Sequence, residues 1–309
     1  MNSGPKTRCA EWALALFAVA VCAAHAAAQD LEPRSYVNTP VGMNFLIAGH
    51  AYFDGRLEFD PALPVADASY HMNTEVFAFA RSLDVFGNSG KFDVIVPYSR
   101  FSGSALVGGQ PKYRDVSGFN DPLFRFSVNF YGAPALSPKE FASYKQDLLI
   151  GASLQVSAPL GQYDNTKLIN LGNNRWAFKP QLGVSKAWGK WTVEVAPGVT
   201  LFTNNNDFNR GGTFDQAPVY SVQAHVVHSF DNGVWLAFDG TYFSGGRTTI
   251  NGVQNDTLQT NTRAGLTLAL PVDRHSSIKL YASTGTSTRT GTEFTAYGIA
   301  WQYRWGGGY

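Results

Sequence analysis

The chain has 309 residues, of which 44% are hydrophobic, 14% aromatic and 15% charged, and its formal net charge is +1. A mean hydropathy of −0.14 excludes a protein built from membrane-spanning helices, each of which needs about 20 consecutive apolar residues. The many aromatic residues argue against disorder, and the near-zero net charge gives no basic field for nucleic acid. The composition favours a β-rich chain that has no nucleic-acid partner.

The first 28 residues have the three parts of a secretory signal peptide. Lys6 and Arg8 form the basic start, residues 12–21 form a short apolar stretch, and Ala26–Ala28 provide the small-residue end. The apolar stretch is too short to span a bilayer comfortably, which argues against a membrane anchor. We therefore predict removal of residues 1–28, with cleavage before Gln29.

Removal of this segment changes the composition of the functional chain, which keeps 281 of the 309 residues. Both cysteines, Cys9 and Cys22, are lost, so disulfides play no part in the fold. Loss of Lys6, Arg8 and Glu11 leaves 22 basic and 22 acidic residues, which balance.

Residues 29–42 precede the first expected strand and contain Pro33 and Pro40. We expect them to form a periplasmic N-terminal segment. A further hypothesis is that this segment reaches into the mouth of the protein and gates it.

Alternation of apolar and polar residues with period two dominates the rest of the chain and predicts β-strands. In the cleanest example, every even position from Leu148 to Leu160 is apolar. About twelve strands are expected near residues 43–56, 70–85, 91–105, 117–131, 146–159, 175–188, 190–203, 217–230, 233–245, 258–272, 275–286 and 293–305. Such long strands suit a tilted crossing of a bilayer, which needs about 9 to 11 residues within the hydrocarbon.

Short turns and long loops alternate between these strands. Turns are expected at residues 87–90, 188–190, 231–233 and 273–275, and longer polar loops near residues 57–69, 106–116, 160–174, 204–216, 246–257 and 287–292. Short periplasmic turns alternating with long outer loops are typical of an outer-membrane barrel. With twelve strands, both termini fall on the periplasmic side.

One connection, residues 132–145, is long where a short turn is expected. Ser137-Pro138-Lys139-Glu140 has the pattern of an N-cap, a proline at the first helical position and a capping-box glutamate. A short helix and an ordinary ordered loop are both compatible with this segment.

Aromatic residues gather near the ends of the expected strands, as in the two interface girdles of a membrane barrel. They are Trp176, Trp188, Trp191, Tyr220, Phe230, Tyr242, Trp301, Tyr303 and Trp305. We therefore predict that residues 43–309 form one domain, an all-β, closed, antiparallel transmembrane β-barrel with up-and-down topology. The predicted location is the outer membrane of a Gram-negative bacterium, in contact with its lipid.

Several segments resemble the outer-membrane transporter family named for the meta-pathway of phenol degradation. They are residues 36–45, 159–164, 167–172, 174–180, 245–249, 251–252 and 300–305. The resemblance covers nearly the whole mature chain. It implies a β-barrel that moves aromatic or other small organic compounds across the outer membrane, and it carries over no catalytic residues.

The last strand resembles the signal read by the outer-membrane assembly machinery, which we expect as a partner. Gly298 is followed after two residues by the aromatic pair Trp301 and Tyr303. Such barrels usually end directly on an aromatic residue of that strand, whereas this chain adds three glycines before Tyr309.

Strand alternation also places charged residues of both signs on the inward faces. The predicted lumen-lining residues are Asp93, Arg125, Lys179, Glu194, His225, Asp239, Arg263, Lys279 and Arg304. Such rows could line a narrow path and tune its selectivity, or pair across the lumen and fill it.

No enzymatic, cofactor or metal site is predicted. His228 and Ser229 are adjacent on a strand and point to opposite faces, so they do not form a catalytic pair. Residues 204–207 could offer oxygen ligands to calcium, but a solvated loop explains them equally.

The sequence therefore predicts a passive channel for small organic solutes, hydrophobic or aromatic in character. A structural or adhesive barrel without transport is the main alternative, and an outer-membrane lipid hydrolase is a third one.

Overall fold

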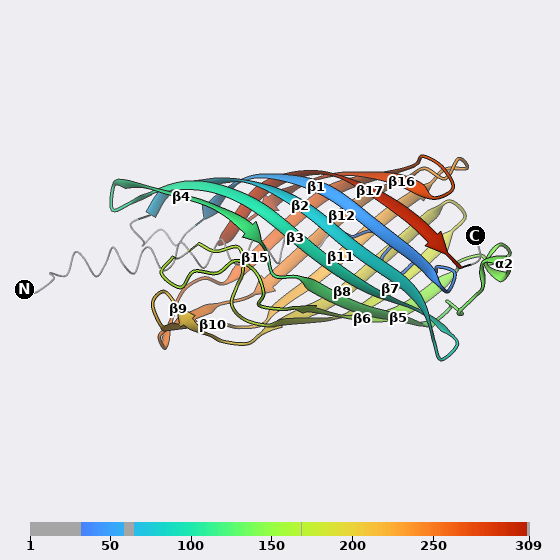
Figure 1. The fold of residues 1–309 in the computed structure, drawn as a ribbon, viewed down its shortest axis with the longest axis horizontal. Coiled ribbons are helices and arrows are strands. Elements are labelled where there is room, and N and C mark those ends of the chain that lie inside the picture. Colours follow the sequence, from blue (N-terminus) through green and yellow to red (C-terminus); the bar gives the residue numbers. More distant parts are fainter. Residues whose placement is uncertain (1–31, 59–64, 168, 308–309) are drawn as a thin grey trace, which may run out of the picture.

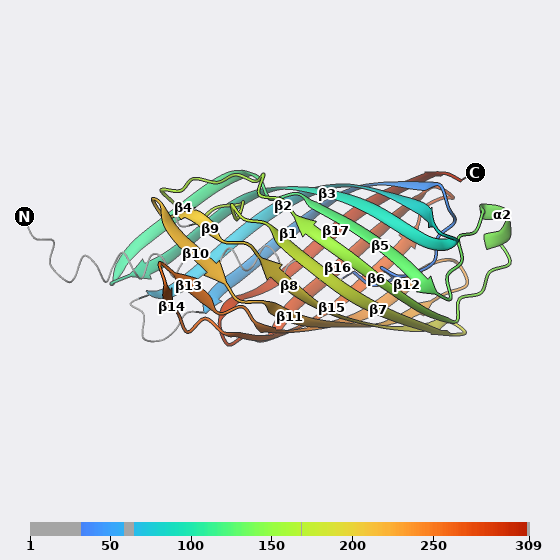
Figure 2. The same ribbon diagram turned by 90° about the horizontal axis from the view of Figure 1, so that it is seen from below.

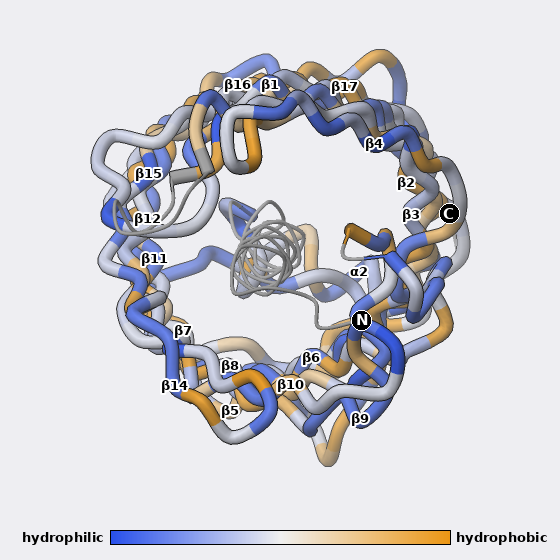
Figure 3. Tube along the Cα trace, turned by 90° about the vertical axis from the view of Figure 1, so that its left-hand side faces the viewer, coloured by the Kyte–Doolittle hydropathy of each residue, from blue (hydrophilic) through white to orange (hydrophobic). Residues whose placement is uncertain are grey.

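The computed structural model describes residues 32–58, 65–167 and 169–307, so the predicted signal peptide lies outside the described residues. Twelve long strands form one antiparallel ring, seen from two sides (Figure 1; Figure 2) and along its axis (Figure 3). In ring order they are β1 (Met43–Glu58), β2 (Val65–Val85), β3 (Asn88–Val107), β5 (Leu123–Tyr131), β6 (Leu148–Ser157), β7 (Ala177–Trp188), β8 (Trp191–Phe202), β11 (Val219–Ser229), β12 (Trp235–Gly245), β15 (Gln259–Pro271), β16 (Ser276–Ser287) and β17 (Gly291–Gly306).

The ring closes between its first and last strands. β1 pairs with β17 from Met43 opposite Gly306 to Glu58 opposite Gly291, and on its other edge β1 pairs with β2. Closure satisfies the backbone groups of every strand without exposing a sheet edge. This arrangement confirms the predicted closed, up-and-down, all-β barrel.

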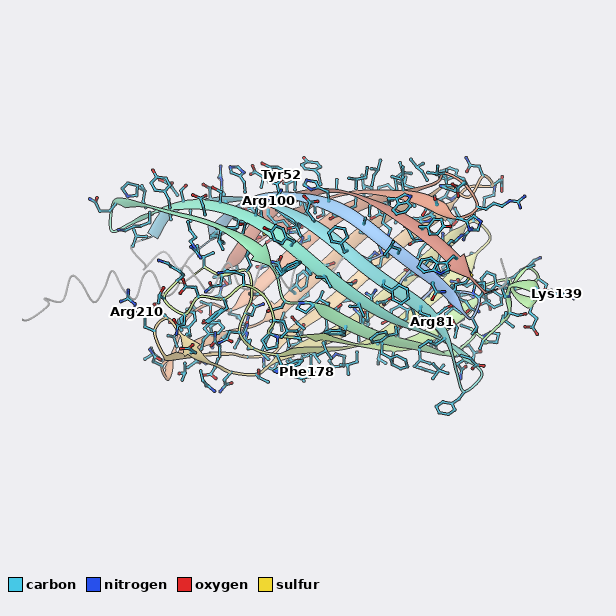
Figure 4. All side chains as sticks on the ribbon, viewed as in Figure 1. Tyr52, Arg81, Arg100, Lys139, Phe178 and Arg210 are labelled. Carbon is cyan, nitrogen blue, oxygen red and sulfur yellow. The ribbon has the colours of Figure 1, made fainter. Side chains whose placement is uncertain are left out.

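Side chains alternate between the lumen and the outer surface. On β7, Lys179 and Ser185 are buried inside, whereas Phe178 and Leu182 are exposed outside, and Phe178 is labelled on the outer surface in Figure 4. The outer surface of the ring is therefore apolar, and the inner one is largely polar. This division is what the period-two pattern of the sequence predicts.

All nine aromatic residues assigned to the interface girdles lie on the outside with exposed rings. On β17, Trp301, Tyr303 and Trp305 form one outward row in which successive ring centroids are 6.0 and 5.9 Å apart. Aromatic rings in such positions suit the boundary between hydrocarbon and water.

The prediction of one continuous strand over residues 117–131 is wrong, both in where the strand starts and in its being unbroken. The structure has β4 (Gln110–Phe119) and then β5, separated by Asn120, Asp121 and Pro122. Proline has no N–H for the ladder, and the two polar side chains bond elsewhere. Ser99 donates its hydroxyl to Asn120, and Gly161 donates its backbone N–H to Asp121, 2.7 and 2.9 Å away.

The predicted loop at residues 106–116 is also wrong. β3 and β4 form a hairpin with Gly108 and Gly109 at the turn, both with positive φ. Similarly, β2 begins at Val65 inside the predicted loop 57–69. The predicted loops 204–216 and 246–257 contain a small separate sheet of β9 (Asn205–Phe208), β10 (Gly212–Gln216), β13 (Thr248–Ile250) and β14 (Val253–Gln254).

The turn between β2 and β3 lies earlier than predicted. It consists of Phe86 and Gly87, with φ of 52° and 82°, and Asn88 already pairs with Val85. Two central residues with positive φ define the tight turn that matches strand twist. The sequence misleads here because phenylalanine rarely adopts this conformation.

The short turns and one long connection, residues 132–147, lie at one end of the barrel, which we call the turn end, and the other long connections lie at the opposite end, the loop end. At the turn end, residues 132–147 contain helix α2 (Pro138–Phe141). Ser137 and Glu140 form the predicted capping box, whose hydrogen bonds from Ser137 lower the pKa of the Glu140 carboxyl. No helix of the described residues is both long and apolar enough to cross a membrane.

A charged residue on the outer face tests whether this face lies in lipid. Leu182→Arg should destabilise the barrel by about 2–4 kcal/mol if it lies near the bilayer midplane. Val253→Arg is the matched control, because Val253 is an exposed apolar residue of β14 at the loop end.

Urea unfolding in lipid bilayers provides the measurement. Equal stabilities of the two variants would contradict a lipid-facing position for Leu182.

Candidate functional site: the barrel lumen

The predicted lumen residues fall into three groups by burial. Asp93, Lys179, Glu194, His225, Asp239 and Arg263 are buried on the inner face, and Arg125 and Lys279 are partly buried there. Arg304 is exposed at the turn end, where its Nε donates to the backbone oxygen of Arg274 at 2.8 Å. Strand parity assigns Arg304 to the inner face, but its position near the end of β17 places it on the rim.

On β11, β12 and β15 three inward polar side chains form a hydrogen-bonded group. His225 Nδ1 lies 2.6 Å from one Asp239 oxygen, and Thr267 donates to the other at 2.7 Å. On β15 and β17, the Arg263 guanidinium lies 3.5 Å from the centroid of the Phe294 ring and donates to Ser283. This part of the wall is therefore a packed polar layer, as in small barrels with filled interiors.

The N-terminal segment, residues 32–42, lies inside the barrel. Its Glu32 carboxylate forms an ion pair with Arg125 of β5, whose Nε donates to Asp93 of β3 at 2.8 Å. Two residues further along, the backbone N–H of Arg34 donates to Glu194 of β8 at 2.6 Å. The segment thus bonds directly to two of the charged residues that the sequence assigns to the lumen, Arg125 and Glu194, and reaches a third, Asp93, through Arg125.

Tyr36 is a deeply buried residue of this segment, only 4% exposed. Its hydroxyl lies 3.2 Å from the Ser153 hydroxyl and donates to Gln181 at 3.1 Å. The ring packs on Gly151 and Gly183 of neighbouring strands. A Cβ atom added to Gly183 would lie 2.1 Å from the ring, so only glycine leaves room for it.

The segment is also fixed where it enters the barrel. Ser82 accepts a hydrogen bond from the Met43 N–H at 2.9 Å and donates to the Pro40 carbonyl. The Val41 N–H donates to Leu136 of the 132–147 connection at 2.8 Å. These bonds hold residues 32–42 in the turn-end half of the lumen.

The opposite end is narrowed by the connection between β6 and β7, residues 158–176. Ile169 and Leu171 are buried against the inward residues of β1 to β3, including Phe53 and Phe101. Further along, the Arg175 guanidinium lies 4.3 Å from the centroid of the Phe202 ring. This connection contains much of the sequence that carries the family resemblance, and it folds inward as a cap.

A cavity of about 290 Å³ remains between the segment and the cap. Its apolar lining includes Phe53, Met72, Ala80, Ile95 and Leu123. Its polar lining includes Arg125, Gln155, Lys179, Thr267 and Lys279. The volume lies at the lower limit of about 300–1,000 Å³ that is typical of small-molecule sites.

The candidate catalytic and metal residues have other partners. His228 packs between Trp191 and Phe230, with ring centroids 4.4 and 4.7 Å away. Asp207 accepts two hydrogen bonds from the Asn165 amide, at 2.8 and 2.9 Å, within the loop-end connections. In the described part of the chain, no three metal-ligating side chains converge.

Sequence reasoning missed the site residues that come from outside the strands. Glu32, Arg34 and Tyr36 lie in a segment without strand periodicity, so alternation gives them no orientation. A signal was nevertheless present, because residues 36–45 carry part of the family resemblance.

The fold and its polar, partly filled lumen define a transmembrane β-barrel of the outer-membrane type. The chain belongs to the family described as "Putative MetA-pathway of phenol degradation", whose profile matches residues 60–303. This confirms the family resemblance read from the sequence.

Solved structures show the same fold at low sequence identity. An outer-membrane channel from Pseudomonas putida F1 is 18% identical with a TM-score of 0.76, and the match covers 89% of this chain and 100% of that chain. The translocator domain of the autotransporter NalP from Neisseria meningitidis is 12% identical with a TM-score of 0.55, over 92% and 97% of the two chains. The β domain of the Bordetella autotransporter BrkA is 8% identical with a TM-score of 0.51, over 84% and 98%. No curated protein matches the chain significantly.

A single added methyl group tests the seating of Tyr36. Gly183→Ala should expel the ring and shift the segment toward an unseated state by about 1–3 kcal/mol, the usual cost of overpacking. Gly240→Ala is the control, because a Cβ atom at Gly240 meets no heavy atom closer than 4.0 Å.

Limited proteolysis of the N-terminal segment in folded barrels measures the shift. Equal cleavage rates for the two variants would contradict the packing described for Tyr36.

Proposed function

We propose that this protein is an outer-membrane channel through which small organic compounds, hydrophobic or aromatic in character, diffuse passively. The observation that carries the proposal is the cavity lined by both apolar and polar side chains, which lies between two segments that are not part of the barrel wall. Family membership and the similarity to an outer-membrane channel fold support it.

The proposal includes an orientation and partners. The turn end faces the periplasm, because barrels of this type have short periplasmic turns and longer outer loops. Residues 1–28 act as the export signal, and the Gly298, Trp301 and Tyr303 pattern of β17 is recognised by the assembly machinery. The outer surface contacts lipid, and the transported solute passes without a catalytic step.

Residues 32–42 close the lumen in this proposal. They are bound by hydrogen bonds and ion pairs to at least five strands of the wall, yet they form no part of the ladder. Such a segment can leave without opening the barrel. The channel is therefore gated from the periplasmic side.

Deletion of residues 32–40 tests both parts of this proposal. The intact protein should give little conductance in planar bilayers and slow swelling of liposomes with aromatic solutes. The deleted protein should conduct steadily and admit these solutes faster than sugars of similar size.

A deleted protein that folds but remains sealed would contradict the channel and favour a structural or adhesive barrel. Equal conductance of the intact and deleted proteins would contradict the gate alone.

Removal of a positive charge from the lumen tests whether Arg125 and Lys179 face the conduction path. In the deleted protein, Arg125→Ala or Lys179→Ala should shift ion selectivity toward cations, because each removes a fixed positive charge from the cavity wall. Arg81→Ala is the matched control, because Arg81 is exposed on the outer surface of the barrel (Figure 4).

Reversal potentials in a salt gradient measure this selectivity. If the potential moves equally for Arg81 and for the two lumen residues, neither lumen residue lies on the path.

A further inference from the structure

The ion pair between Glu32 and Arg125 joins the N-terminal segment to the barrel wall. The Glu32 carboxylate would leave with the segment, whereas the Arg125 guanidinium stays on β5. Arg125 is held in place by Asp93, which accepts from its Nε at 2.8 Å and is buried. Its Nη1 meets Glu32, the first described residue of the N-terminal segment. The wall therefore holds a guanidinium in a fixed orientation with one edge turned toward the lumen, where a planar carboxylate fits well.

Other cations of the wall surround the same carboxylate. Lys279 and Lys91 lie within electrostatic range of Glu32, and the Lys91 ammonium also donates to the Ser35 carbonyl at 3.2 Å. Lys279 forms no direct ion pair with any residue that the structure describes, and its ammonium lies 6.0 Å from the centroid of the Trp235 ring. When the segment leaves, these positive charges lose the carboxylate that they share.

Without Glu32, Arg125 keeps Asp93 as its partner, but Lys279 and Lys91 give the site an excess of positive charge, which favours an anion at this place. The anion would lie beside apolar side chains, because Glu32, Arg125 and Lys279 line the same cavity as Met72, Ile95 and Leu123. The cavity therefore combines a carboxylate position with an apolar surface, and its volume of about 290 Å³ suits a ligand with one aromatic ring.

We propose that the lumen contains a binding site for small amphipathic carboxylates, whose carboxylate replaces that of Glu32 on Arg125 and whose apolar body packs on β2, β3 and β5. Glu32 is then a built-in competitor, so ligand binding and release of the N-terminal segment favour each other. This inference rests on the proposed channel function for the route by which the ligand arrives, but the site itself can be tested without transport.

Benzoate and its uncharged analogue benzyl alcohol are suitable probes for the full mature chain folded in detergent micelles. Isothermal titration or ligand-observed NMR gives the affinity. Benzoate should bind the intact protein more tightly than benzyl alcohol does. Glu32→Gln should raise the benzoate affinity about tenfold, because it weakens the competing segment and so increases the fraction of binding-competent protein. Glu293→Gln is the charge-matched control, since Glu293 is exposed on β17.

Removal of the receiving cation should have the opposite effect. Arg125→Gln should abolish the preference for benzoate over benzyl alcohol, with folding checked by the heat-dependent shift of the barrel on gels. Lys279→Gln keeps the Asp93 contact intact and should lower benzoate affinity severalfold, which tests the site even if the Arg125 variant does not fold.

Three results would overturn the proposal. They are equal affinities for benzoate and benzyl alcohol, an unchanged affinity in Glu32→Gln, and inorganic sulfate that binds as tightly as benzoate. These results are separable from failure of the channel. A protein that binds benzoate as expected but passes no solute would contradict the channel and keep the site, whereas solute flux without benzoate preference would do the reverse.

Discussion

Closure of the ring between β1 and β17 is the constraint on which the rest of the structure depends. Within hydrocarbon, each backbone N–H and C=O without a partner costs several kcal/mol, so a spanning sheet cannot leave an edge. Pairing along the full length of β1, from Met43 to Glu58, removes the last two edges. Closure also fixes the alternation of side chains, because one face of every strand must meet lipid and the other must meet an enclosed interior. The scarcity of charged residues in the whole chain follows from the lipid face.

The enclosed interior creates the second requirement, since its polar and charged side chains need partners. On β11, β12 and β15 the partners come from the wall itself, as in the group of His225, Asp239 and Thr267. On β5 and β8 the N-terminal segment supplies the partners of Arg125 and Glu194. The N-terminal segment is thus held by Arg125 and Glu194. In the proposed open state, without the segment, a solute would meet these same charges. Occlusion and ligand preference are, in this account, two consequences of the same set of buried charges.

The sequence predicts the strands of the barrel wall well, but it does not predict how the N-terminal segment and the β6–β7 connection fold into the lumen. Period-two alternation locates all twelve strands within a few residues, except where Asn120 to Pro122 leave the ladder to bind the inward loop. The capping box at Ser137 and Glu140 is a local signal and is confirmed. By contrast, the inward fold of residues 32–42 and 158–176 depends on contacts between residues far apart in the sequence, such as Tyr36 with Gln181 and Asn120 with Leu171. Arg304 shows what alternation leaves undetermined. The parity of a residue on its strand predicts whether the side chain points inward or outward, but not how far from the end of the barrel it lies.

A reversible lock on the N-terminal segment tests the central claim most directly. Residues 29–309 contain no cysteine, so Tyr36→Cys and Gly183→Cys, two positions in direct contact, can be joined as a disulfide. We predict that the oxidised protein stays closed in planar bilayers and that a reductant added to the same channel opens it, because the Tyr36 ring no longer holds the segment. Identical conductance before and after reduction, with the disulfide verified by mass spectrometry, would contradict the claim that residues 32–42 close the lumen.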